Sequence, residues 1–216
     1  MTHQQKPDRE IRQGLDIEKF RAFRAFAAEN PQAVMFGLEA SGTAEGRAVH
    51  THAMTGAYTL GGNRIDRIAR RYSYHFGAHR EVEDALGFVN PTDREQETEV
   101  ALAALAGCIN AVVTVSAAER GIDLASLRTD IAITWDPAVF LHLRDTEEKG
   151  KPVDQFEGFT ITLEVCCDDL GPNDIEFLSR TVQRSAVFNL FTLARDVRVE
   201  VANVPEGSRM ADGSIR

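Results

Sequence analysis

The residues of this chain that are best suited to chemistry are its three cysteines, Cys108, Cys166 and Cys167. Cys108 follows Ala106-Gly107 in a strongly apolar stretch. A thiol is a useful nucleophile only as the thiolate, which forms when a nearby cation or a helix N-terminus lowers its pKa. A free cysteine also packs well as a small apolar side chain. Cys108 is therefore either a reactive thiol or a core residue, and periodicity alone favours the core residue.

Cys166 and Cys167 are adjacent at the end of an expected strand, where neighbouring side chains point to opposite faces. This alternation places Cys167 with Val165 on the apolar face and Cys166 with Glu164 on the polar face. Two consecutive cysteines are not a Cys-x-x-Cys motif, and such neighbours seldom form a disulfide with each other. We therefore expect both to be packing residues.

The other candidate sites have weaker support. His50 and His52 could share one face of a strand, but no carboxylate or cysteine stands at ligand spacing beside them, so we expect no metal site. Ser185 lacks the Gly-x-Ser-x-Gly surroundings of a hydrolase nucleophile. Gly61-Gly62 is a turn rather than a phosphate-binding loop, so nucleotide binding has no support. No cofactor is expected.

Length and composition are those of one globular domain: 216 residues, 43% hydrophobic and 26% charged. The net charge of −9 and the absence of a basic patch argue against nucleic acid as a partner. Three cysteines cannot form a paired framework, which indicates a reducing compartment. The first 33 residues have neither the apolar core of a secretory signal nor the acid-poor composition of a transit peptide, so we expect a cytoplasmic protein that does not associate with membranes.

The N-terminal half of the sequence predicts one helix followed by strands. Asp16 is placed to cap a helix that should end near Asn30-Pro31. Further expected elements are a strand at 34–38, a turn at 41–46, a strand at 47–60, a strand at 72–76 and an irregular acidic loop from Arg80 to about Gln96.

The C-terminal half predicts a long helix, Glu97 to Arg120, with Gly121 as its C-cap. It is apolar almost all round, so we expect it to be buried on most sides, partly by a second subunit. Polar residues interrupt its most apolar part, 100–118, which favours a core helix over a membrane span. The other expected elements are strands at 127–135 and 159–165, a charged loop at 145–155, a helix opening at Gly171-Pro172-Asn173 with Asn173 as its cap, and a strand at 197–201.

This order predicts an α+β fold, since the strands do not alternate regularly with helices. We expect an N-terminal extension at 1–33, a single domain at 34–204 and a flexible tail at 205–216. The N-terminal helix and the loop at 136–158 would be additions to that domain.

The long helix resembles the central helix of the OsmC/Ohr superfamily, the osmotically induced and organic hydroperoxide resistance proteins. The resemblance rests on Asn90-Pro91 and on the run from Glu99 through small residues and leucines to Gly107-Cys108. The downstream order of two strands, a helix and a terminal strand also matches. The resemblance covers about residues 34–204 and implies an intertwined homodimer with two sites at its interface.

For this chain the resemblance implies a thiol peroxidase in which Cys108 attacks an organic hydroperoxide or hydrogen peroxide. Glu99 matches the family glutamate, and Arg80 is our choice for the family arginine, with Arg70 and Arg71 as rivals. Nine residues correspond to about 900° of helix, so a continuous helix would place Glu99 and Cys108 on opposite sides. The pair then works only if Glu99 precedes the helix proper or acts across the dimer.

The chain departs from the family pattern at the second cysteine, whose place is taken by Ser185. A hydroxyl cannot form the disulfide, which leaves three outcomes: an external thiol resolves Cys108, Cys167 substitutes, or peroxidase activity has been lost. The first outcome gives a one-cysteine peroxidase that uses an external thiol reductant. The alternatives are a non-catalytic protein that binds a small hydrophobic ligand, and a structural dimer in which Cys108 only packs.

Overall fold

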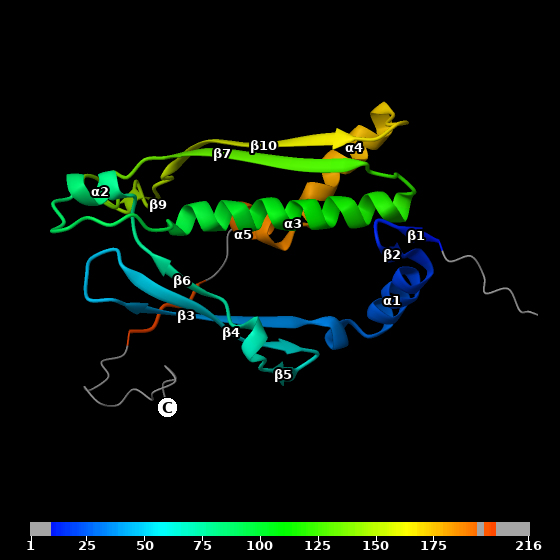
Figure 1. Cartoon of the computed structure of the whole chain (residues 1–216), viewed down its shortest axis with the longest axis horizontal. Coiled ribbons are helices and arrows are strands. Elements are labelled where there is room, and N and C mark those ends of the chain that lie inside the picture. Colours follow the sequence, from blue (N-terminus) through cyan, green and yellow to red (C-terminus); the bar gives the residue numbers. More distant parts are fainter. Residues whose placement is uncertain (1–9, 194–196, 202–216) are drawn as a thin grey trace, which may run out of the picture.

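The structure, a computed structural model, describes residues 10–193 and 197–201. Helices and antiparallel strands alternate irregularly along the chain (Figure 1), which confirms the predicted mixture of helix and strand. The helices are α1 Ile17–Glu29, α2 Arg80–Ala85, α3 Glu97–Arg120, α4 Pro172–Thr181 and α5 Ala186–Thr192, with short 3-10 turns η1 Pro31–Val34, η2 Ile68–Arg70 and η3 Val182–Arg184. The strands are β1 Ile11–Arg12, β2 Leu15–Asp16, β3 Phe36–Ala44, β4 Thr51–Leu60, β5 Asn63–Ile65, β6 Ser73–Phe76, β7 Ser126–Trp135, β8 Glu147–Glu148, β9 Lys151–Pro152 and β10 Phe156–Cys166.

The N-terminal helix α1 begins and ends where the sequence predicted. The Asp16 carboxylate accepts a hydrogen bond from the backbone N–H of Lys19 at 3.0 Å, which satisfies one of the free donors of the first turn. Asn30 ends the helix, and Pro31 begins η1. Ile17 at the start of α1 is fully buried. The extension is thus an ordered part of the fold from its first hairpin, β1–β2, onward.

Strands β3, β4, β5 and β6 form one antiparallel sheet, with β4 paired to all three others. The predicted turn at 41–46 was wrong, because β3 stays paired with β4 as far as Ala44 opposite Thr51. The chain reverses instead at 45–50, where Gly46 and Val49 have positive φ. Val34 also lies outside the strand, in η1, since Pro31 favours a helical turn there.

The segment after β6 is more ordered than predicted. The sequence indicated an irregular loop from Arg80 to about Gln96, but its first part is the short helix α2. The loop closes on itself through two backbone hydrogen bonds, Gly77 N–H to Glu95 C=O at 3.1 Å and Arg94 N–H to Ala78 C=O at 3.2 Å. We call residues 77–96 the α2 loop.

Helix α3 confirms the predicted bounds and carries the core. Gly121 caps it in the left-handed conformation, at φ 87°. Its buried stripe packs against the antiparallel β7–β10 ribbon and against α4 and α5; the fully buried members are Leu105, Ile109, Val113 and Ala117. Cα partners run from Phe156 opposite Trp135 to Cys166 opposite Ser126, with one irregularity between Glu157 and Thr160.

The C-terminal part departs from the sequence prediction in three ways. The second helix begins two residues earlier than predicted, with Gly171 as N-cap and Pro172 as its first residue, so Asn173 is not the cap. It is not continuous, because η3 and a break at Ser185 separate α4 from α5. Residues 197–201 form no strand, and their valines are exposed. The predicted tail at 205–216 lies outside the described residues.

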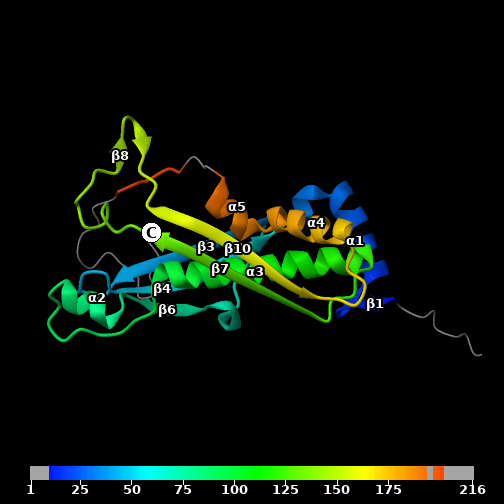
Figure 2. The same cartoon turned by 90° about the horizontal axis from the view of Figure 1, so that it is seen from above.

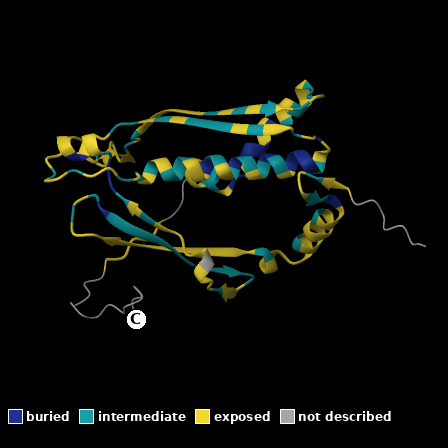
Figure 3. Ribbon diagram, viewed as in Figure 1, coloured by how far each residue is buried: buried dark blue, intermediate teal, exposed yellow. Residues whose placement is uncertain are grey.

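Helix α3 lies between the β7–β10 ribbon and the four-stranded sheet (Figures 1 and 2). Only its ribbon side is well covered: 28% of its most apolar 18-residue window is buried, so the expectation of burial on most sides is not met within one chain. Strand β3 is exposed along its whole length (Figure 3). By length and composition α3 could cross a membrane, but its packing against β7, α4 and α5 is typical of a core helix.

Candidate functional site

Cys108 lies in the middle of α3, at the edge of its buried stripe. Its neighbours Leu105 and Ile109 are fully buried, whereas Cys108 is half-buried and Gly107 is exposed. The thiol is free, and among the described residues no hydrogen bond to its sulfur is found. The side chain therefore stands between the core and an uncovered face of the helix, which leaves it within reach of a small molecule or of another chain.

Glu99 lies inside α3, not before it. Its carboxylate accepts a hydrogen bond from the Gln96 backbone N–H at 3.4 Å and completes a capping box at the start of the helix. Glu99 and Cys108 are nine residues apart on one continuous helix, about 13.5 Å along its axis and on opposite sides. The structure therefore does not bring these two together within one chain. The Glu99 carboxylate lies 3.4 Å from Nε2 of His79 instead.

The three candidate arginines lie in different places. Arg80 begins α2, next to His79, and its backbone N–H donates to the Asp93 carboxylate at 3.3 Å. Arg70 holds its guanidinium over the rings of Tyr58 and Tyr72, 5.8 and 5.9 Å from their centroids. Arg71 pairs with Asp66 at 2.8 Å. Of the three, Arg80 is the one whose neighbour touches Glu99.

Ser185 has a structural duty that explains why a hydroxyl suits this position. It is fully buried, and its Oγ accepts a hydrogen bond from the Phe188 backbone N–H at 3.1 Å, so it caps α5. Ser185 is the residue at which the chain leaves η3 and starts α5.

The remaining cysteines and histidines divide as their surroundings dictate. As the strand alternation predicted, Cys167 packs beside the core cluster and Cys166 lies on the outer face; both are free thiols. The expectation that Cys166 is a packing residue was wrong, because this side chain is exposed. His50 is 2% exposed and lies 2.5 Å from Glu83, whereas the His52 ring stacks on His75 with centroids 4.5 Å apart. The two histidines thus have different partners, and the described residues contain no cluster able to hold a metal ion.

A buried polar network around Glu83 was not foreseen from the sequence. The Glu83 carboxylate is fully buried, accepts a hydrogen bond from the Thr92 backbone N–H at 2.8 Å and lies 2.5 Å from His50 Nε2. The Thr92 hydroxyl lies 3.2 Å from both carboxylate oxygens. These hydrogen bonds, led by that of the Thr92 backbone, lower the pKa of Glu83 to about 2 despite its burial. Nothing in the sequence distinguished Glu83 from the other acidic residues near it.

A second polar cluster lies on the exposed side of the β3–β4 turn. Glu45 pairs with Arg94 and with His75, whose Nδ1 is 2.7 Å from the carboxylate. The hydrogen bonds from Arg94 and then His75 lower the pKa of Glu45. This cluster joins the turn to the end of the α2 loop.

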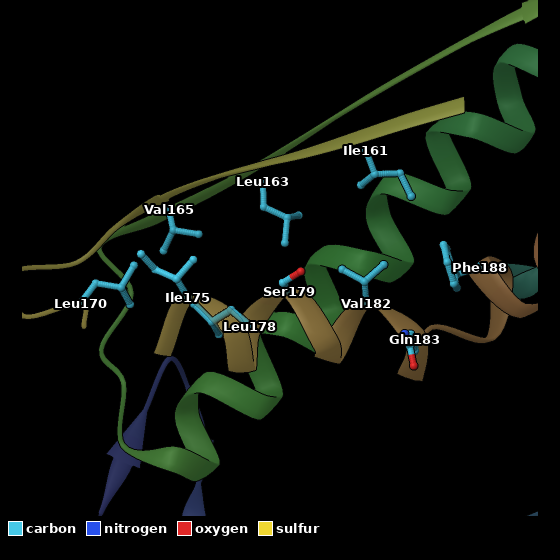
Figure 4. A pocket seen from close by; sticks show the side chains of 10 residues that line it. All are labelled: Ile161, Leu163, Val165, Leu170, Ile175, Leu178, Ser179, Val182, Gln183 and Phe188. Atoms are coloured by element: carbon cyan, nitrogen blue, oxygen red, sulfur yellow. The ribbon is translucent and has the colours of Figure 1, made fainter. Parts of the chain in front are cut away.

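Two open cavities are lined mainly by apolar side chains. One, of about 540 Å³, lies between β10 and α4–α5 (Figure 4); Ile161, Leu163 and Val165 line one wall, Leu178 and Val182 the other. A second, of about 600 Å³, lies on the four-stranded sheet; its lining includes Phe36, Leu38, Tyr58, Arg70 and Tyr72. Neither cavity is lined by Cys108.

Comparison with known proteins gives little guidance. No family model matches the sequence, and no curated protein matches it. Among solved structures, one similar chain is an organic hydroperoxide resistance protein OsmC from Legionella pneumophila, described as a predicted redox protein. It is 16% identical, covers 73% of this chain and 90% of its own, and has a TM-score of 0.43. At this level the likeness assigns neither family nor activity to the present chain.

Proposed function

We propose that this chain is an OsmC-like thiol peroxidase that acts as a homodimer, with Cys108 as the reacting residue and an external thiol as reductant. The observation that carries the proposal is the place of Cys108. It is a free, half-buried thiol in the middle of an apolar helix, at the margin of a surface that none of the described residues covers. The sequence resemblance around Glu99 and Cys108 gives the reaction class.

Two uncovered surfaces support the proposed homodimer. Along α3 the exposed residues Ala103, Gly107, Ala111 and Val115 are spaced by four and so lie on one face; all but Val115 are small. Small side chains allow another element to approach the helix axis closely. The four-stranded sheet exposes large apolar side chains, among them Phe36 at 62% and Leu38 at 82%. In a dimer, the sheet of one copy could cover the α3 stripe of the other copy. Both apolar surfaces would then be removed from water.

The dimer also offers a role for Glu99. Within one chain Glu99 lies on the opposite side of α3 from Cys108, so any catalytic pairing has to use one copy's Glu99 and the other's Cys108. Arg80 follows His79, which contacts Glu99, and would join the same composite site. The Arg80 guanidinium would stabilise the Cys108 thiolate, and the Glu99 carboxylate would orient that guanidinium.

The reaction balances without a second cysteine. The Cys108 thiolate attacks the distal peroxide oxygen, the O–O bond breaks, and Cys108 becomes a sulfenic acid while an alcohol, or water from hydrogen peroxide, leaves with a proton. A first external thiol displaces water and forms a mixed disulfide with Cys108. A second thiol attacks that disulfide and releases Cys108 together with the oxidised reductant. Ser185 takes no part and serves as the cap of α5.

The test is the rate of Cys108 oxidation by cumene hydroperoxide and by hydrogen peroxide, with sulfenic acid trapped and located by mass spectrometry. Wild type is expected to form the adduct at Cys108, and Cys108→Ser to form none at that position and to lose turnover with a thiol reductant. Cys166→Ser is the matched control, since it removes an exposed thiol. A wild-type Cys108 that stays reduced in folded protein at millimolar hydroperoxide would overturn the peroxidase proposal.

A second candidate function, binding of a small hydrophobic ligand without catalysis, has one observation in its favour. The cavity between β10 and α4–α5 is large enough for a small molecule and is lined mainly by aliphatic side chains. Ser179 and Gln183 are its polar lining residues (Figure 4). The test is the thermal shift with decanoate and with aromatic acids. A shift that Leu163→Trp removes, in a protein whose Cys108 does not react, would favour this function.

A further inference from the structure

The buried network of the α2 loop connects two parts of the chain that the proposed function does not link. Glu83 comes from α2, Thr92 from the return limb of the same loop, and His50 from the turn before β4. The His50 ring also stacks on Phe88, with centroids 6.0 Å apart. Glu83 and His50 therefore fasten the loop to itself and to the sheet at a single buried point.

Arg47 reinforces the same point from the β3–β4 turn. Its guanidinium lies over the Phe88 ring at 5.3 Å and 3.7 Å from the Glu83 carboxylate. It also donates to the Val89 carbonyl at 3.2 Å. The Glu83 carboxylate is fully buried and has several hydrogen-bond partners. Moving the loop would cost free energy, because the charge would lose these partners.

The neck of this loop carries the residues that meet the start of α3. Backbone hydrogen bonds join Gly77 to Glu95 and Ala78 to Arg94. The next two residues are His79, whose Nε2 lies 3.4 Å from the Glu99 carboxylate, and Arg80. Glu83 stands one helical turn further along α2, where the Val82 and Glu83 N–H groups donate to the His79 carbonyl. The position of Glu83 thus sets the position of His79 and Arg80.

We propose that His50 and Glu83 form a positioning pair, which holds the α2 loop so that His79 keeps the Glu99 carboxylate, with Arg80 beside it, in place for the thiol reaction. This inference rests on the proposed function. The pair touches no substrate and acts only through His79 and Glu99. Loss of the pair would leave the thiol itself intact but lower its reactivity toward hydroperoxide.

A double-mutant cycle tests this role. Glu83→Gln keeps the shape of the side chain and removes its charge, and Glu99→Gln keeps the capping box. Each single variant is expected to slow Cys108 sulfenic acid formation at least tenfold, and the double variant to be no slower than Glu99→Gln alone. Ile17→Val, a change to a fully buried residue of α1 at a distance from the loop, is the control for loss of stability and is expected to leave the rate unchanged.

The possible outcomes separate the two proposals. If wild-type Cys108 does not react, the proposed function fails, and the pair is then judged by hydrogen exchange of the Arg80 and Thr92 amides, which Glu83→Gln should accelerate at least tenfold and Ile17→Val should not. If wild type reacts and the two slowing effects multiply, or Glu83→Gln leaves the rate unchanged, the positioning role is wrong. His50→Phe should reproduce the Glu83→Gln rate if the two residues act as a pair.

Discussion

At the scale of single residues, the same amino-acid type has different meanings in different surroundings. Cys108 and Cys167 are both half-buried thiols, but Cys167, the residue after β10, packs beside the core, whereas Cys108 lies at the margin of an uncovered helix face. Ser185 is a fully buried serine whose hydroxyl caps α5. The proposed chemistry therefore rests on where Cys108 lies, and not on how many thiols the chain has.

Ser185→Ala provides the first prediction at this scale. It removes the acceptor for the Phe188 N–H, so we expect a loss of about 1 kcal/mol in the free energy of unfolding, measured by urea denaturation. The rate of Cys108 oxidation should stay within about twofold of wild type, because the hydroxyl serves the helix and not the thiol. Ser179→Ala, on the exposed side of α4, is the control. A large loss of rate with unchanged stability would give Ser185 a chemical role.

Glu83 gives a prediction for pH. Its pKa is about 2 in the folded protein against an ordinary 4.5, so its charged form stabilises the fold fully above pH 4.5, and this contribution is lost as pH falls toward 2. We expect the urea midpoint of Glu83→Gln to lie below that of wild type at neutral pH, and the gap to narrow steadily below about pH 4.5. A gap that stays constant from pH 7 to pH 3 would contradict the shifted titration.

Residue-level chemistry was only partly predictable from the sequence. The place of Cys167 and the cap at Asp16 follow from local spacing, so both could be predicted. Glu83 and His50 are 33 positions apart, and their pairing depends on how the α2 loop returns to the sheet, which no local pattern records. His52 illustrates the same limit, since its cross-strand neighbour His75 decides its role.

At the scale of elements, α3 could be predicted almost residue for residue, because its apolar composition and its C-terminal glycine point to the observed bounds. The errors fall where two signals compete. The run Ser41–Ala44 has turn-forming residues, but cross-strand pairing with β4 keeps it extended. The alternating valines at 197–201 have strand spacing, but the described chain offers them no partner.

Gly121 gives the prediction that belongs to this scale. Gly121→Ala places a Cβ on a residue at φ 87°, so we expect a loss of about 1–2 kcal/mol in the free energy of unfolding, measured in urea. The new Cβ also meets the Arg12 side chain, which is flexible enough to move. Gly87→Ala is the matched control, since Gly87 has φ 83° and open space around it. Equal losses of unfolding free energy in the two variants would show that the backbone conformation causes the destabilisation. No loss in either variant would contradict the prediction.

At the scale of the whole molecule, the chain has two unequal halves. The ribbon, α3, α4 and α5 share a core, whereas the four-stranded sheet exposes both large apolar residues and the aromatic pocket around Arg70. The hydrophobic composition of α3 predicted that other elements bury it on most sides. It could not show that the described part of one chain buries α3 on one side only. A second copy would complete both halves with surfaces the chain already has.

Ala111→Glu tests that assembly. Ala111 lies in the exposed small-residue stripe of α3, so a glutamate there costs a single chain little, yet it would place a charge in the interface of a homodimer. Light scattering should give wild type twice the 23.9 kDa chain mass and the variant one chain mass. Ala132→Glu, on an exposed position of β7 outside the stripe, should leave the dimer intact. Because the proposed composite site needs both copies, monomeric Ala111→Glu should also oxidise Cys108 at least tenfold more slowly. A wild-type protein that is monomeric by light scattering and still oxidises Cys108 at the rate expected of the proposed dimer would contradict the composite site.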